Sequence, residues 1–172
     1  MVPVQNKPLF FALIAGGTIL LDQITKFLIQ REMPLHESVV LIQGFFSLTH
    51  IRNPGAAFGF LANQSAGFRS IFFLVISIIA LSLLLAFYRQ IPKEDLWSLL
   101  AVSLLFGGAI GNLIDRIRFG EVVDFLDFYI GRYHWPAFNV ADSAITIGIS
   151  LLMFDLFWSK REAPAADLRG CK

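Results

Sequence analysis

Long apolar runs are the most prominent pattern in this sequence. Residues 71–88 and 96–114 contain no charged side chain, and the run 143–159 is interrupted only by Asp155. Each run comes close to the ~20 apolar residues that a helix needs to cross the hydrocarbon core of a bilayer. These three runs therefore predict membrane-spanning helices.

A fourth run begins near the N-terminus. Residues 8–21 carry no charge, but at ~1.5 Å of rise per residue they are too short to span a bilayer alone. The helix must therefore continue through Asp22 and Lys26. A cleaved signal peptide is the alternative, suggested by the small residues 15–17, but the apolar run extends beyond them. We predict four transmembrane helices, at about 8–29, 70–88, 96–114 and 140–159.

Composition supports a membrane protein and excludes several kinds of site. Hydrophobic residues make up 56% of the chain and the mean hydropathy is +0.66, which is too apolar for an ordinary soluble domain. The net charge is +1, and no basic-aromatic patch indicates nucleic acid binding. The only cysteine is Cys171, so an internal disulfide or a cysteine metal cluster is excluded. His36, His50 and His134 are too scattered for an HExxH motif, which excludes a zinc metalloprotease by motif. The mechanism expected below needs no metal and no cofactor.

The segment between the first two helices is long for a linker. Its sequence SVVLIQGFFSLTHI predicts two short strands around Gly44, and RNPGAAFGF then predicts a turn. Because unpaired backbone is costly in lipid, this β-cradle, at about 36–60, must lie at the membrane surface. The expected fold is an α-helical integral membrane protein, with one embedded domain over 1–161 and a disordered cytoplasmic tail over 162–172.

Helix parity places the unusual polar residues on one face of the membrane. Four spans put both termini on one side. The end of the first helix, the start of the second, the end of the third and the start of the fourth then meet on the other side. Basic residues are denser in the termini and the 89–95 loop than in the longer loops, which favours cytoplasmic termini. We therefore expect loops 30–69 and 115–135 outside the cytoplasm. The polar residues at that face are Asp22, Lys26, Asn53, Asn112, Asp115, Arg116, Asp124, Asn139 and Asp142.

Two of these aspartates suggest catalysis. Asp124 lies among apolar neighbours in VVDFLDF, where a carboxylate is poorly hydrated and needs a partner. Asp142 follows Asn139 by three residues, a capping-box spacing that also has a purely structural explanation. Asp127 is equally acidic but is expected only to be solvated. Paired carboxylates at a membrane surface, without a GxSxG or zinc motif, favour an aspartic peptidase.

The other intramembrane charges are open to two interpretations. Asp22 and Lys26 are spaced i,i+4 and could form a structural ion pair or take part in function, since charges within a spanning helix are costly. Asp115 and Arg116 could likewise form a structural network or hold a lipid headgroup.

Three further residues have simpler explanations. Gly107 and Gly111 lie one helical turn apart, a pattern of small residues that indicates close helix packing. Asp155 lies toward the other end of its helix and is expected at the opposite membrane interface, near Lys160.

Five sequence blocks together resemble bacterial lipoprotein signal peptidase, also called signal peptidase II. They occur in the family's order and extend from the first helix to the fourth, which makes the resemblance highly specific. The family is a four-helix inner-membrane aspartic endopeptidase with a periplasmic β-cradle. The blocks are LDQITK (21–26), RNPGAAFGF (52–60), GGAIGNLIDR (107–116), VVDF (122–125) and PAFNVADSAI (136–145).

The resemblance assigns an expected role to each matching position. Asp124 and Asp142 match the catalytic dyad. Positions expected to bind substrate or support the site are Asn53, Gly55, Asn112, Arg116, Asn139 and Ala141. Positions expected to serve folding or site architecture are Asp22, Lys26 and Asp115.

The expected reaction is removal of the signal peptide from diacylglyceryl-modified prolipoproteins, just before the lipidated cysteine. Two like carboxylates cannot both ionise readily, so one would hold a proton while the other activates a water. The pair titrates as a unit, which leaves the protonated member open. We expect a monomer in the bacterial inner membrane, in contact with lipid, with its active site on the periplasmic side. The alternatives are a small proton-coupled transporter, using Asp22 and Asp142, and a non-enzymatic membrane scaffold.

Overall fold

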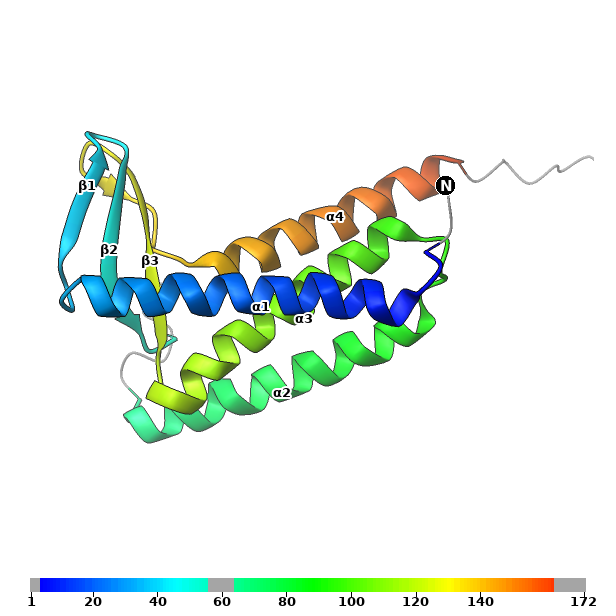
Figure 1. Cartoon of the computed structure of the whole chain (residues 1–172), viewed down its shortest axis with the longest axis horizontal. Helices are drawn as coiled ribbons and strands as arrows, with labels where there is room; N and C mark the ends of the chain where they lie inside the picture. The colour runs from blue at the N-terminus through cyan, green and yellow to red at the C-terminus, as the bar shows by residue number, and fades with distance from the viewer. Residues whose placement is uncertain (1–3, 56–63, 163–172) are drawn as a thin grey trace, which may run out of the picture.

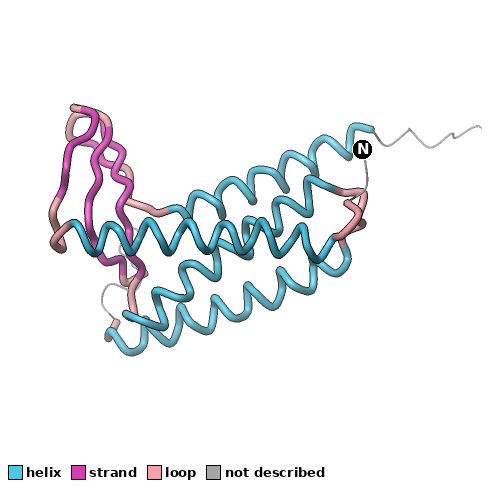
Figure 2. The backbone as a smooth tube through the Cα atoms, in the orientation of Figure 1, coloured by secondary structure: helices cyan, strands magenta, loops and turns pink. Residues whose placement is uncertain are grey.

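The computed structural model describes residues 4–55 and 64–162. Four helices lie side by side along the long axis of the molecule, and a small β-sheet caps one end (Figures 1 and 2). All four helices are long and apolar enough to cross a membrane, so the predicted four-helix membrane fold is confirmed. The helices are α1 (Lys7–Glu32), α2 (Ala66–Gln90), α3 (Leu96–Phe119) and α4 (Val140–Glu162).

Helix α3 forms the centre of the bundle. It contacts each of the other three helices, and 56% of its most apolar stretch is buried, compared with none of the corresponding stretch in α2. Glycines allow the close approach: a Cβ added at Gly107 would lie 2.8 Å from the backbone oxygen of Ala15, and one at Gly111 would lie 2.6 Å from Asp22 Oδ2. The predicted role of these two glycines in close helix packing is confirmed.

The sheet is larger than the predicted cradle. Strands β1 (Ser38–Ile42) and β2 (Phe46–Asn53) form the expected hairpin around Gly44. Two further strands, β3 (Val122–Ile130) and β4 (Tyr133–His134), complete an antiparallel sheet in the order β1-β2-β3-β4.

The expectation of a loop over 115–135 is therefore corrected. Residues 122–125 are all buried, so this segment lacks the alternation of apolar and polar residues that marks a strand with one solvated face. Its pairing with β2 places Asp124 opposite Ile51 and Val122 opposite Asn53. These partners lie far away in the sequence, and the local pattern could not indicate them.

Helix α3 also runs beyond its predicted end at residue 114. It ends at Gly120, whose φ of 75° suits glycine, and β3 begins two residues later. This tight exit brings Asp115 on α3 and Asp124 on β3 to the same end of the bundle. Residues 56–60 of the expected cradle, and all of the expected tail except Glu162, lie outside the described residues.

Candidate active site

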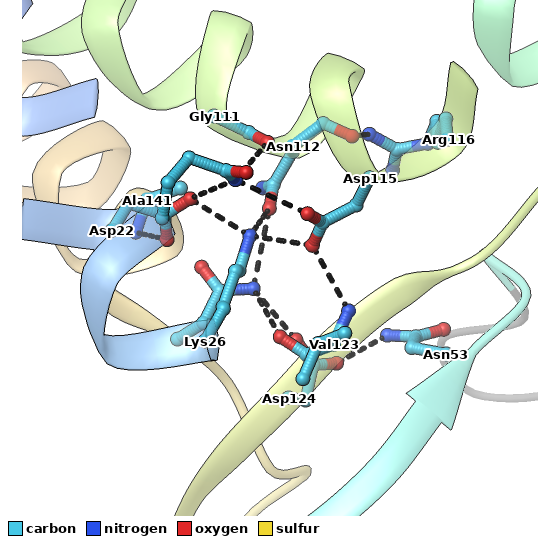
Figure 3. A network of polar contacts seen from close by, with 12 residues as sticks. Asp22, Lys26, Asn53, Gly111, Asn112, Asp115, Arg116, Val123, Asp124 and Ala141 are labelled. Carbon is cyan, nitrogen blue, oxygen red and sulfur yellow. Dashed lines mark hydrogen bonds and ion pairs between the residues drawn. The ribbon is translucent and has the colours of Figure 1, made fainter. Parts of the chain in front are cut away.

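The predicted polar residues converge where the sheet meets the helix ends. Figure 3 shows side chains from α1, α3, β2 and β3 directed toward one another at this position. We call this region the sheet end of the bundle: it contains the last turns of α1 and α3, the first turns of α2 and α4, and the sheet. The parity argument anticipated this gathering, although residues from separate parts of the chain had to be brought together by folding.

Asp124 lies on β3 and is almost completely buried, with 1% of its surface exposed. Each of its carboxylate oxygens accepts a hydrogen bond from an asparagine: Oδ1 from Asn139 at 2.7 Å and Oδ2 from Asn53 at 2.8 Å. The pKa of Asp124 is raised to about 7, first by burial and next by the carboxylate of Asp142, against the hydrogen bonds and the charge of Lys26. This carboxyl group therefore exchanges its proton near neutral pH.

Asp142 lies in the first turn of α4 and forms a complete capping box. Its backbone N–H donates to Asn139 Oδ1 at 2.9 Å, and its Oδ2 accepts from the backbone N–H of Asn139 at 3.2 Å. The predicted capping geometry is present. Its other oxygen, Oδ1, accepts from Asn112 Nδ2 at 2.8 Å. The cap thus holds the carboxylate in place and leaves it connected to the rest of the site.

Three asparagines hold their amide nitrogens toward the two aspartates. Gly55 N–H donates to Asn53 Oδ1 at 2.9 Å, which leaves the Asn53 amide nitrogen facing Asp124. Asn139 is oriented in the same manner, because its oxygen accepts from the first turn of α4. Since an amide has one acceptor end and one donor end, occupying the oxygen determines what the nitrogen faces. The third asparagine, Asn112, also accepts at its oxygen while its nitrogen donates to Asp142.

A buried charge network supports this arrangement from behind. The ammonium of Lys26 lies 2.9 Å from Asp22 Oδ2 and 2.8 Å from Asp115 Oδ2, and all three side chains are at most 1% exposed. Asp22 Oδ1 accepts from Ala141 N–H at 2.9 Å, and Asp115 Oδ2 accepts from Val123 N–H at 3.1 Å. The two carboxylates therefore attach α1 and α3 to the starts of α4 and β3.

Sequence reasoning missed Gln23 as a member of this network. Its Nε2 lies 3.2 Å from Asp22 Oδ2, 3.1 Å from Asp115 Oδ1 and 3.1 Å from the carbonyl oxygen of Gly111. Its position between two intramembrane residues, Asp22 and Lys26, was the available signal. A polar side chain at that depth needs partners.

Two remaining candidates line the edge of the site. Arg116 is half-buried, donates to the backbone oxygen of Asn112 at 3.2 Å and lies 5.5 Å from the centre of the Phe73 ring. Gly55 has a φ of 88°, and a Cβ there would meet the same ring at 2.1 Å. Asp127, by contrast, pairs with His134 at 2.9 Å farther along β3 and has no recorded bond to the network.

A groove opens beside Asp142. Its volume is about 550 Å³, and its walls comprise Asn53, the segment 135–138 and one side of α4, with Asp142, Ser143, Thr146 and Ile147. The walls are mostly apolar, and Asp142 is the acidic residue among them. A substrate chain lying in this groove would reach an aspartate directly.

Comparison with known proteins identifies the family. The family model for signal peptidase (SPase) II matches residues 14–158. The chain belongs to the signal peptidase II family. The lipoprotein signal peptidase of Syntrophus aciditrophicus is 52% identical to it over 159 residues, covering 92% of this chain and 99% of the relative. That of Geobacter sulfurreducens is 48% identical, with the same coverage.

Solved structures agree with this family. Two are described as bacterial membrane enzymes determined by the in meso method. One matches with a TM-score of 0.78 and 38% identity, covering 94% of both chains. The other has a TM-score of 0.76 and 42% identity, covering 85% of this chain and 91% of that one. The chain is thus a multi-pass bacterial membrane peptidase that removes signal peptides from prolipoproteins, and the transporter alternative is not supported.

Proposed function

We propose that this signal peptidase II is an aspartic endopeptidase that cuts just before a diacylglyceryl-modified cysteine, with Asp124 and Asp142 as its catalytic dyad. The observation that carries the proposal is the frame of hydrogen bonds from Asn53, Asn112 and Asn139 that the two aspartates share. Each of their four carboxylate oxygens accepts a hydrogen bond, and Asn139 donates to both residues. Of the acidic side chains described, these two are the pair connected by asparagines beside the groove.

The electrostatics suit acid–base chemistry. With a pKa of about 7, Asp124 can hold a proton while its partner is ionised. The ionised carboxylate takes a proton from a water, whose oxygen attacks the scissile carbonyl carbon. The protonated carboxyl donates a hydrogen bond and then a proton to the carbonyl oxygen. Collapse of the tetrahedral intermediate breaks the C–N bond: one of its two hydroxyl groups returns a proton to the ionised carboxylate of the dyad, and the leaving amine takes a proton from the other carboxyl group.

The lipid on the substrate would supply much of the binding energy. The groove reaches from Asp142 along one side of α4 to Ile147, its apolar wall is the segment 135–138, and the outer faces of the helices carry many exposed apolar side chains. An acyl chain gains ~0.8 kcal/mol for each methylene it buries. Two chains anchored between helices and lipid would therefore hold the scissile bond at the depth of the dyad.

The proposed orientation places the sheet end on the periplasmic side of the inner membrane, in a protein that works as a monomer. The density of basic residues supports cytoplasmic termini. Single cysteines introduced at positions 64 and 93 in a Cys171→Ser background test this orientation in whole cells. An external thiol reagent should label position 64 and spare position 93, and the reverse pattern would reject the orientation.

The deciding experiment compares two substrates with purified enzyme. A prolipoprotein carrying the diacylglyceryl group should be cut before the modified cysteine, and the same precursor without lipid should be cut far more slowly. Equal turnover of both precursors would reject the lipid requirement. Mass spectrometry of the products locates the cut.

A further inference from the structure

Lys26 contacts Asn112 in addition to the two carboxylates whose charge it neutralises, Asp22 and Asp115. An ammonium group has three N–H donors and no acceptor. In Lys26 two donors face the carboxylates of Asp22 and Asp115, and the third faces Asn112 Oδ1 at 3.0 Å. Figure 3 shows the Lys26 side chain extending from α1 with its ammonium directed at all three residues. The third contact connects a buried positive charge to an asparagine that donates to Asp142.

That contact determines the direction of the Asn112 side chain. Asn112 Oδ1 accepts from Lys26 and also lies 3.2 Å from Asn139 Nδ2. Reversing the amide would place its NH2 group against two donors, one of them a full positive charge. Nδ2 therefore faces Asp142 Oδ1, at 2.8 Å. Gly55 and the α4 cap orient the other two asparagines in the frame, whereas a charged side chain from α1 orients this one.

Lys26 also contributes to the charge balance around the dyad. Its positive charge lowers the pKa of Asp124, against burial and the carboxylate of Asp142. Arg116 on α3 also interacts electrostatically with both aspartates. The acidic groups Asp22 and Asp115 are in direct contact with Lys26.

We propose that Lys26 is a positioning residue of the peptidase: through its contact with Asn112 Oδ1 it orients the Asn112 amide toward Asp142, and it brings a buried positive charge to the site. The inference rests on the proposed assignment of Asp124 and Asp142. It goes beyond an architectural role, in which Lys26 would only neutralise Asp22 and Asp115. The two roles predict different pH profiles.

Lys26→Gln is the first test, measured as kcat and KM for a lipidated precursor between pH 5 and pH 9. Loss of Asn112 orientation should lower kcat by about 10- to 100-fold with little change in KM. Removing a positive charge makes both carboxylates of the dyad harder to ionise. Both limbs of the pH profile should therefore move to higher pH, by roughly one unit.

Gln23→Leu is the matched control. Gln23 also contacts Asp22 and Asp115, but it has no recorded bond to Asn112, Asp124 or Asp142. Its replacement should lower the melting temperature and leave the pH profile in place. A purely architectural Lys26 would behave in the same way as this control.

A double-mutant cycle that combines Lys26→Gln with Asn112→Ala tests whether Lys26 acts through Asn112. If Lys26 acts through Asn112, the double variant should lose about as much kcat as Asn112→Ala alone. Should Lys26→Gln fail to fold, Asp22→Asn combined with Lys26→Met removes one charge of each sign and takes its place in the double-mutant cycle. A pH profile at the wild-type position, together with additive losses, would overturn the role of Lys26. Failure of the dyad assignment gives a different result, because Asp124→Asn and Asp142→Asn would then remain active.

Discussion

The two ends of the helical bundle are packed in different ways: polar side chains fill the sheet end, and apolar side chains fill the opposite end. At the sheet end, buried polar side chains are numerous and almost every one has a partner, as with Lys26, which contacts three acceptors. At the opposite end, Ile91, Leu99 and Val102 form an apolar core packed against residues of α1 and α2. Buried polar groups are costly unless satisfied. A network on this scale at one end therefore indicates chemistry rather than stability alone.

Polar contacts at the opposite end are isolated. Ser98 on α3 donates to Asp155 on α4 at 3.2 Å, and Lys7 donates to the carbonyl oxygen of Ile91 at 2.6 Å. Asp155 was expected at this membrane interface, and its partner there is Ser98. Such single bonds contribute about 1 kcal/mol each, which is enough to fasten two elements. The contrast leads to four predictions, taken from the largest expected effect to the smallest.

Removing either carboxylate of the proposed dyad should have the largest effect. Asp124→Asn and Asp142→Asn should each lower kcat by ~10²- to 10⁴-fold, because general acid–base catalysis contributes about that much and the dyad acts as a unit. Cleavage of a lipidated precursor by monodisperse purified protein provides the measurement. Asp127→Asn is the matched control on the same strand and should retain near-normal turnover. An inactive Asp127→Asn beside an active Asp124→Asn would reassign the acid on β3.

Raising the pH through about 7 should lower both activity and stability. Activity falls because the dyad loses the proton it needs when Asp124, with its pKa of about 7, ionises. For stability, a folded pKa above the unfolded value of 3.8 means that the native state binds more protons between these two values. This contribution is full below the unfolded pKa and is lost as the pH rises through 7.

Thermal melting in detergent between pH 4 and pH 9 checks the stability part of this prediction. Asp124→Ala should show a flatter dependence on pH in that range. The same slope in wild type and variant would assign the titration to another group. Activity that stayed constant up to pH 9 would contradict the proposed protonated state of the dyad.

Replacing a closely packed glycine by alanine should affect kcat at the sheet end of the bundle but only stability elsewhere. A Cβ at Gly111 would lie 2.6 Å from Asp22 Oδ2, and a Cβ at Gly148 would lie 2.8 Å from the backbone oxygen of Ala101. Gly111→Ala and Gly148→Ala should each destabilise the protein by about 1–3 kcal/mol, because the packed neighbours must move. Gly111→Ala should also lower kcat, since Asp22 holds the start of α4, whereas Gly148→Ala should affect melting alone.

Gly16→Ala is the control for helix propensity. Among the described residues, no atom beyond the adjoining residues and the backbone of its own helical turns lies within 4 Å of its added Cβ, so the substitution should leave stability unchanged or raise it by up to about 1 kcal/mol. Equal effects of all three substitutions on kcat would remove the distinction between the ends.

Breaking the contact between Ser98 and Asp155 should have the smallest effect. Ser98→Ala should cost about 1 kcal/mol of stability, because one hydrogen bond between α3 and α4 is lost. Turnover of lipidated precursor should stay within about twofold, since an effect of 1 kcal/mol or less on folding leaves nearly all molecules native. A large loss of kcat would show that the opposite end communicates with the dyad.

Much of the fold could be predicted because its signals are local. Helix α2 carries no charge over 71–88, and strand β2 alternates between apolar and polar residues after the turn at Gly44. Strand β3 could not be recognised, because its residues 122–125 are buried together and its partner strand lies some 70 residues away. Helix ends moved by a few residues, as with α2, which begins at Ala66 rather than near residue 70, because caps and turns decide where helices end.

The sequence by itself determined the four spans, the face on which the polar residues gather, and the identity of two unusual aspartates. Apolar length and the parity of crossings are enough for these conclusions, since both follow from the cost of leaving backbone or charge in lipid. Tertiary structure alone decided which polar atoms meet. The bond from Asn53 to Asp124 joins residues 71 apart, and that from Ala141 to Asp22 joins residues 119 apart. The direction in which an amide or carboxylate faces depends on partners supplied by other elements, and no local pattern records them.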